Sequence, residues 1–237
     1  MRHIVPVDEI PPDVPLLKGI EGPARERVLA CLQATYIAYD AGELVREANV
    51  AQNYAAYLVR GKADGYVYDE EGNRSILHLF VSGQVISYGK VFGSSSWSSF
   101  DVVAREECRI ILFNTDHVPV NCEQCQRYVA QVERNLAQAV ADLDAEIMTT
   151  LNIRLRRTMR GKVLAFLEYE ARRRGTNEFD IAFNRQELAD YLCVDRAALS
   201  RELASLRDEG QFDFERNHFV VHLKPKLRKG APGTRQP

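Results

Sequence analysis

Three side chains in the carboxyl-terminal third of the chain have the types and spacing needed to read a nucleic acid. Ser200 and Arg201 follow Arg196 by four and five residues, so on a helix the three share one surface with the small Ala197. The guanidinium group of arginine donates paired hydrogen bonds to guanine O6 and N7 or to phosphate oxygens. The apolar residues of this segment fall on the other face and are Leu199, Leu203 and Leu206. The segment therefore predicts a helix that packs through its leucines and presents donors to a DNA groove.

Two short helices joined by a tight turn must position that surface. Asn184 is expected to cap the first helix, and Glu187 three residues later can bond back to the amide of the cap. Residues 193–194 form the turn, and Asp195 is expected to cap a second helix that runs to about Asp208. This arrangement predicts a helix-turn-helix.

An ordinary amphipathic helical hairpin with solvated arginines is the alternative for this segment. The next residues weigh against it, because positions 210–222 alternate like two strands around a turn at Arg216-Asn217. A hairpin directly after the second helix favours a winged helix-turn-helix.

The charge of the chain changes sign along its length. Residues 1–150 carry 13 Lys/Arg against 21 Asp/Glu, a balance of −8, and residues 151–237 carry 18 against 12, a balance of +6. A basic carboxyl-terminal part after an acidic amino-terminal part indicates a sensor joined to a nucleic-acid reader.

The sequence gives no sign of export or membrane insertion. It has no run of about 18 apolar residues, and its proline-rich and acidic amino terminus is not a signal peptide. Five cysteines at irregular spacing are not a disulfide framework for a chain of this size. We therefore expect a cytoplasmic protein with reduced thiols.

Residues 35–113 have the pattern of a barrel or roll, because short β-branched and aromatic runs alternate with Gly, Asp and Asn. Before them we expect an extended, proline-rich lead-in over residues 1–20 and a helix from Pro23 to about Leu32. The expected strands are 36–37, 44–45, 56–59, 65–68, 76–80, 84–87, 100–104 and 109–113.

Between Pro119 and about Leu155 the apolar residues recur every three or four positions, which predicts one long helix. A partner within the chain is one alternative for its apolar stripe. We favour a parallel helix from a second subunit, because the strand-rich domain is too small to cover the whole stripe. The residues expected at this dimer interface are Val129, Val132, Leu136, Val140, Leu143, Ile147 and Leu151. A further helix from about Thr158 to Arg174, capped by Gly175, leads into a strand over 179–183.

This order of parts resembles the Crp-Fnr superfamily of bacterial transcription regulators. The most specific matching residues are Asn184–Leu192 with Asp195-Arg196 and Ser200-Arg201, together with Leu58–Gly65 and Asp69–Gly72 in the roll. The resemblance implies an α+β chain with three parts. These are a jelly-roll-like, cyclic-nucleotide-binding-like β-roll in residues 1–118, a dimerisation helix in 119–155, and a winged helix-turn-helix DNA-binding domain in 156–237. It also implies a homodimer on a pseudo-palindromic operator, and the family admits RNA polymerase as a partner.

The resemblance assigns roles to individual residues of the DNA-binding part. Arg196 matches the family's guanine-reading arginine, and Arg201 matches its second arginine. Ala197 stands where many members have glutamate, so a cytosine contact is lost and the family's best-known operator is not expected. The remaining expected DNA-binding residues are Asn184, Arg185, Gln186, Asp195 and Ser200, of which the first three hold positions that contact the backbone.

The effector implied by the resemblance is not cyclic AMP. In the family's cyclic-nucleotide site a Gly-Glu pair binds the ribose and an Arg-Ser pair the phosphate, whereas this sequence has Ser87-Tyr88 and Ser98-Ser99. A buried phosphate without that arginine would lack its paired cation. One alternative is a small apolar or aromatic effector, and plain core packing is the other reading of the same residues. The expected pocket residues are Ser87, Tyr88, Trp97, Ser98, Ile147 and Met148.

An iron-sulfur cluster is a further hypothesis for the sensor. Cys108 matches by position the roll cysteine of the family's anaerobic regulator, but residues 1–30 lack the cysteine-rich arm that supplies the other ligands there. Cys122 and Cys125, with Cys108 and Cys31, would be the four candidate ligands. An isolated C-x-x-C is a weak signal, so structural thiols are favoured. His78 is expected to be an ordinary strand residue rather than a haem ligand.

We expect no enzymatic activity, because the sequence has no glycine-rich phosphate loop, paired-histidine metal motif or Gly-x-Ser-x-Gly elbow. The alternative from another class is a thiol or metal redox protein that uses Cys122 and Cys125 and carries a degenerate DNA-binding half. Salt-sensitive binding of a palindromic DNA fragment separates the two hypotheses.

Overall fold

The computed structural model describes residues 2–50, 54–87, 99–114 and 123–222. The chain falls into two compact units, Met1–Leu151 and Asn152–Pro237. Within the described ranges no helix is both long enough and apolar enough to cross a bilayer.

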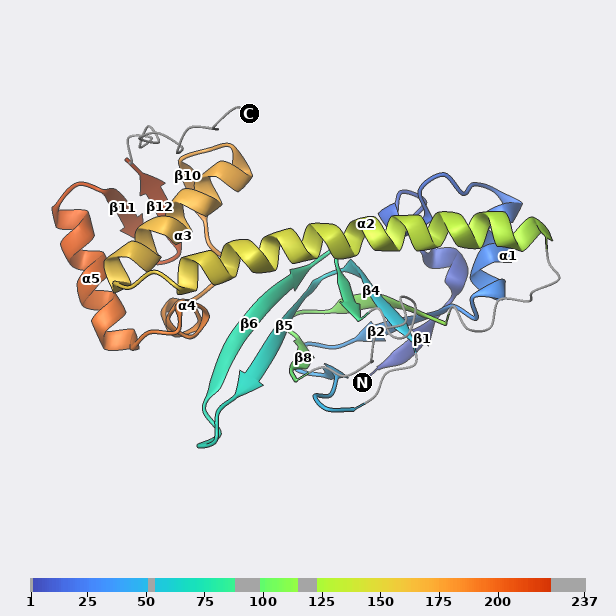
Figure 1. The fold of residues 1–237 in the computed structure, drawn as a ribbon, viewed down its shortest axis with the longest axis horizontal. Coiled ribbons are helices and arrows are strands. Elements are labelled where there is room, and N and C mark those ends of the chain that lie inside the picture. Colours follow the sequence, from blue (N-terminus) through green and yellow to red (C-terminus); the bar gives the residue numbers. More distant parts are fainter. Residues whose placement is uncertain (1, 51–53, 88–98, 115–122, 223–237) are drawn as a thin grey trace, which may run out of the picture. The chain divides into compact units, whose positions relative to one another are not determined.

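Two antiparallel sheets form the roll of the first unit (Figure 1). One has the strand order β1-β2-β9-β4-β7 and the other the order β3-β8-β5-β6. Their strands are β1 (His3–Val5), β2 (Thr35–Tyr39), β3 (Leu44–Arg46), β4 (Ala55–Arg60), β5 (Lys62–Tyr68), β6 (Arg74–Val81), β7 (Val85–Ser87), β8 (Asp101–Ala104) and β9 (Cys108–Phe113). The eight strands expected between residues 35 and 113 are confirmed, and so is the roll.

The five-stranded sheet is buried on both faces. Successive residues of a strand point to opposite faces, so neighbouring side chains enter different cores. Leu58 and Ile110 join Phe80 of the four-stranded sheet in one core. Tyr57 and Ile111, one position along, join the core on the outer face of the sheet.

Helices α1 (Pro23–Cys31) and α2 (Glu123–Arg154) contribute to that outer core. Val28 and Leu32, at the end of α1 and just after it, cluster with Val132 and Leu136 of α2. Figure 1 shows α1 beside the amino-terminal part of α2. The helix expected from residue 23 is confirmed and ends at Cys31.

The expectation of an extended lead-in over residues 1–20 is wrong in part. Strand β1 pairs with β2, and two 3-10 turns, η1 (Val7–Glu9) and η2 (Pro15–Leu17), follow it. Leu16 and Leu17 are each only 2% exposed. The apolar side chains between the prolines fold back onto the outer core, a contact that local composition does not reveal.

The long helix is confirmed as α2, but its apolar stripe is used in two ways. Val129, Val132, Leu136 and Leu143 are buried in the cores of the chain's own first unit, and Val140 is partly buried there. Ile147 and Leu151, near the carboxyl end of α2, are exposed to 37% and 44%. Of the residues expected at the dimer interface, Ile147 and Leu151 are thus the most exposed in the single chain.

The second unit begins with the end of α2 and continues through α3 (Met159–Arg174) to β10 (Glu178–Asp180). Thr158 caps α3, and Gly175 ends it in the left-handed conformation with φ +68°, as expected. Strand β10 is shorter than the expected 179–183. Beyond it Phe183 turns into the core, where its ring stacks on Tyr191 with centroids 4.7 Å apart.

Candidate nucleic-acid interface and sensor region

Two capped helices form the helix-turn-helix. Helix α4 (Arg185–Leu192) begins at Asn184, whose side chain accepts from the Glu187 amide at 3.0 Å, and the Glu187 carboxylate accepts from the Asn184 amide at 2.7 Å. Helix α5 (Arg196–Asp208) begins at Asp195, whose carboxylate accepts from the Ala198 amide at 2.7 Å. The expected capping box and second cap are confirmed.

Helix α5 separates its buried face from its exposed face as the sequence predicts. Leu199, Leu203 and Leu206 are each at most 1% exposed. The other face brings together four of the expected DNA-binding residues, all exposed, namely Arg196, Ala197, Ser200 and Arg201. The Ser200 hydroxyl donates to the Arg196 carbonyl at 3.0 Å, which leaves the arginine side chains as the main donors of this face.

Two cations hold the turn between the helices. Arg154, in the last turn of α2, donates from Nε to the Tyr191 carbonyl at 2.6 Å, and its guanidinium lies 4.8 Å from the centre of the Tyr191 ring. Burial lowers the pKa of Arg154. Lys162 donates to the carbonyls of Leu192 at 3.0 Å and Cys193 at 3.3 Å. The sequence alone did not reveal the contacts of Arg154 and Lys162 with these carbonyls, because the partners lie 30 or more residues away.

The wing follows α5 as a hairpin of β11 (Phe212–Glu215) and β12 (His218–Val221), and β10 pairs with β12. Arg185 of α4 reaches this wing. Its guanidinium donates to the Arg216 carbonyl at 3.1 Å and lies 5.0 Å from the centre of the Phe214 ring. Burial lowers the pKa of Arg185. Arg185, which we expect at the DNA backbone, also anchors the wing to α4. Gln186 is exposed and donates to the Asp190 carboxylate at 2.8 Å.

The expected effector pocket falls only in part on described residues. Tyr88, Trp97 and Ser98 lie outside them. Ser87, at the end of β7, is buried and donates to the Tyr54 carbonyl at 3.5 Å. Ile147 and Met148 are exposed on α2, Met148 to 56%.

A series of hydrogen-bonded side chains links the roll to α2 at Glu146, the residue before Ile147. His78 is a buried residue of β6, as expected, and its Nε2 lies 3.1 Å from Gln84 Oε1. Gln84 donates to the Glu146 carboxylate of α2 at 2.6 Å. These contacts join β6 and the turn before β7 to α2.

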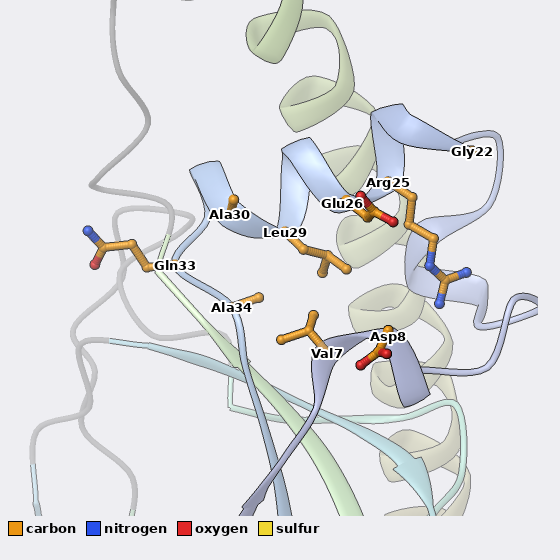
Figure 2. Close-up of a pocket in the computed structure, with 9 residues that line it drawn as sticks. All are labelled: Val7, Asp8, Gly22, Arg25, Glu26, Leu29, Ala30, Gln33 and Ala34. Atoms are coloured by element: carbon orange, nitrogen blue, oxygen red, sulfur yellow. The ribbon is translucent and has the colours of Figure 1, made fainter.

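A pocket of about 410 Å³ lies between η1 and α1, away from the expected effector residues (Figure 2). In Figure 2, Val7, Leu29 and Ala34 converge in its centre, while Gln33 points away. Arg25 is held by the carbonyls of residues 10–12 at 2.6–3.0 Å, so its donors serve the fold. The remaining lining residues are Asp8, Gly22, Glu26 and Ala30.

The described cysteines do not fit an iron-sulfur cluster. Cys108 is fully buried and its thiol donates to the Lys62 carbonyl at 3.1 Å. Burial raises the pKa of Cys108 to about 11. Cys125 lies against Cys31. Cys122 lies outside the described residues, and those that are described hold no group of three His, Cys, Asp or Glu able to bind a metal.

A winged helix-turn-helix with exposed arginines, in one chain with a β-roll and a long helix, defines a DNA-binding transcription regulator of α+β fold. Residues 161–229 match the Crp-like helix-turn-helix domain, and residues 36–122 match the cyclic nucleotide-binding domain. The chain belongs to the Crp-Fnr family of transcription regulators.

Individual proteins agree with this assignment. The chain is 25% identical over 197 residues to the transcriptional activator protein FnrL of Cereibacter sphaeroides, covering 78% of this chain and 75% of FnrL. Its fold resembles FixK2 from Bradyrhizobium japonicum, with a TM-score of 0.59 and 22% identity over 80% of this chain and 93% of FixK2. It also resembles the c-di-GMP responsive regulator CLP of Xanthomonas campestris, with a TM-score of 0.67 and 14% identity over 84% and 98% of the two chains. The alternative of a redox protein with a degenerate DNA-binding half is not favoured, because the caps, the exposed face of α5 and the wing are all present.

Proposed function

We propose that the chain acts in the cytoplasm as a homodimer that binds a specific pseudo-palindromic DNA sequence through α5, under the control of an effector other than cyclic AMP. The main observation behind the proposal is that α5 exposes Arg196, Ser200 and Arg201 on one face while its leucines are buried on the other. In this proposal residues 1–118 sense the effector, 119–155 dimerise and 156–237 bind DNA. None of these parts is proposed to be catalytic.

Each proposed contact has a role set by its place in the motif. Arg196 lies in the first turn of α5, the part of a recognition helix that enters the major groove, and is proposed to read a guanine. Arg201 and Ser200 lie on the same face. Asn184 and Asp195 are proposed to approach the backbone while their side chains hold the helix caps. Two-fold symmetry then places half-sites about one helical turn apart, roughly 34 Å.

Replacement of Arg196 tests the base-reading role. We expect Arg196→Ala to weaken binding of the selected operator by about 1–3 kcal/mol and to relax preference at one base pair of each half-site. The measurement is DNA affinity by fluorescence anisotropy on a set of single-base operator variants. Arg172→Ala is the matched control, because Arg172 is exposed on α3, pairs with Glu168 and carries the same charge. An equal loss of affinity for every sequence in the Arg196 variant would contradict the assignment.

The dimer surface is proposed at the exposed end of α2. Ile147 and Leu151 are apolar yet 37% and 44% exposed. A lysine there would bury a charge in the interface. We expect Leu151→Lys to dissociate the dimer in sedimentation experiments and Gln138→Lys, at an exposed position on another side of α2, to leave it intact. Dissociation by neither variant would place the interface elsewhere.

The effector is proposed to act on the contact between roll and α2. A ligand shifts a conformational equilibrium only if it binds one arrangement more tightly than the other. The hydrogen bonds that join His78, Gln84 and Glu146 could be formed in one such arrangement and broken in the other. We expect cyclic AMP to leave DNA affinity unchanged, and a saturable increase of affinity with cyclic AMP would refute this part of the proposal.

A further inference from the structure

Two thiols meet between the first and second helices. The Sγ atoms of Cys31 and Cys125 are 2.6 Å apart, although the residues are separated by 94 positions in the sequence. Cys31 is the last residue of α1, and Cys125 lies in the first turn of α2. The contact is one between two thiols, either of which could donate a hydrogen bond to the other.

The packing of the two helices holds this pair together. Cys31 follows Val28 by about one helical turn on α1, and Cys125 precedes Val129 by about one turn on α2. Val28 and Val129 belong to the same buried core. The two thiols thus extend an interface that the apolar residues already fix, so their contact does not depend on a mobile side chain reaching across solvent.

The two thiols differ in their access to solvent. Cys125 is 1% exposed, whereas Cys31 is partly exposed at the end of its helix. A dissolved oxidant therefore reaches Cys31 first, and Cys125 is in contact with Cys31 and positioned to react with it next. This is the arrangement of an attacking thiol and a resolving thiol.

We propose that Cys31 and Cys125 form a reversible intramolecular disulfide by exchange with a low-molecular-weight disulfide, RSSR. The Cys31 thiolate attacks one sulfur of RSSR, which breaks its S–S bond, forms Cys31–S–SR and releases RS⁻ to take up a proton. The Cys125 thiolate then attacks the Cys31 sulfur and releases the second RS⁻, which is protonated in turn. The two protein thiols lose two electrons and two protons, and RSSR becomes two RSH. In a reducing compartment the pair remains reduced until small disulfides accumulate.

This disulfide would enclose the roll in a covalent loop. Every strand from β2 to β9 lies between Cys31 and Cys125. The bond would also tie α1 to the start of α2, the pair of helices that covers the outer face of the five-stranded sheet. Cys31 and Cys125 both belong to the first unit, whereas the arginines of α5 belong to the second.

The test is to map the disulfides of the full-length protein after incubation with oxidised glutathione. Trypsin followed by cleavage after Glu123 separates Cys122 from Cys125. We expect mass spectrometry to find the Cys31 peptide joined to the Cys125 peptide with the loss of two hydrogen atoms. We also expect the thiol count of the unfolded chain to fall by two and to recover after reduction with dithiothreitol.

Single variants identify the role of each thiol. Cys122→Ser and Cys193→Ser should leave the linked peptide unchanged, and Cys31→Ser should abolish it. Cys125→Ser should stop the reaction at glutathione bound to Cys31, because the resolving thiol is gone. The proposal is overturned if oxidation joins Cys122 to Cys125, if it links two chains, or if Cys31 carries glutathione in the wild type while Cys125 remains free.

Discussion

Arg154 offers the sharpest test of how the helix-turn-helix is held in the second unit. Its Nε donates to the Tyr191 carbonyl at 2.6 Å, and its guanidinium stacks over the Tyr191 ring at 4.8 Å. Arg154→Ala removes both contacts. The carbonyls at the end of α4 would then keep the hydrogen bond from Lys162 to Leu192. The perturbation should therefore loosen α4 without touching the exposed face of α5.

The size of the effect follows from these contacts. A hydrogen bond to a charged donor contributes about 1.5–3 kcal/mol, and a partly desolvated cation over an aromatic ring about 0.5–2 kcal/mol. Part of this is offset, since the half-buried guanidinium was itself desolvated, as its lowered pKa indicates. We expect a net loss of about 2 kcal/mol in the local stability of α4, or roughly a 30-fold faster exchange of its protected amides.

Native-state hydrogen exchange of the full-length protein measures this directly, with peptides that cover residues 185–195. Arg157→Ala is the matched control, because Arg157 is exposed only three residues further along the chain. An exchange rate in α4 that changes less than about twofold in Arg154→Ala, or equally in both variants, would refute the role of Arg154 in stabilising α4.

Three further variants test other contacts. Leu136→Ala, at a side chain with 0% exposure in the core of α1 and α2, should lower the free energy of unfolding in urea by about 2–5 kcal/mol, and a loss below 1 kcal/mol would contradict that packing. Asn184→Ala removes the cap of α4 and should lower the free energy of unfolding in urea by about 1 kcal/mol. Gln186→Ala, at an exposed position in the same turn, should lower it much less. The pKa of Cys108 is raised from 9.0 to about 11, so its stabilising contribution is present below pH 9 and is lost as the pH rises towards 11. Unfolding of Cys108→Ala should therefore depend less on pH in that window than unfolding of the wild type, and an identical dependence would count against the burial of this thiol.

The DNA-binding part could be predicted from the sequence because its signals are local. The cap at Asn184 bonds an amide three residues away, and the leucines of α5 repeat at helical spacing. Such signals depend on short stretches of chain, so they locate the helices and the face that carries Arg196 and Arg201 without knowledge of the rest of the fold.

The same kind of pattern could not decide what covers α2. Leu136 and Leu151 belong to one apolar stripe, yet Leu136 is buried by the chain's own strands and helix α1 while Leu151 is 44% exposed. Periodicity shows which side of a helix is apolar but not which surface meets it.

The sequence by itself determined the eight strands of the roll, the long helix and the exposed arginines of α5, because these follow from residue periodicity and capping within a few turns of chain. Only the tertiary structure decided that Arg185 anchors the wing, that Arg154 holds the end of α4, and that Cys31 meets Cys125. Each of those contacts joins residues 31 to 94 positions apart, and the path of the chain between them, set by the packing of all its elements, determines which side chains meet.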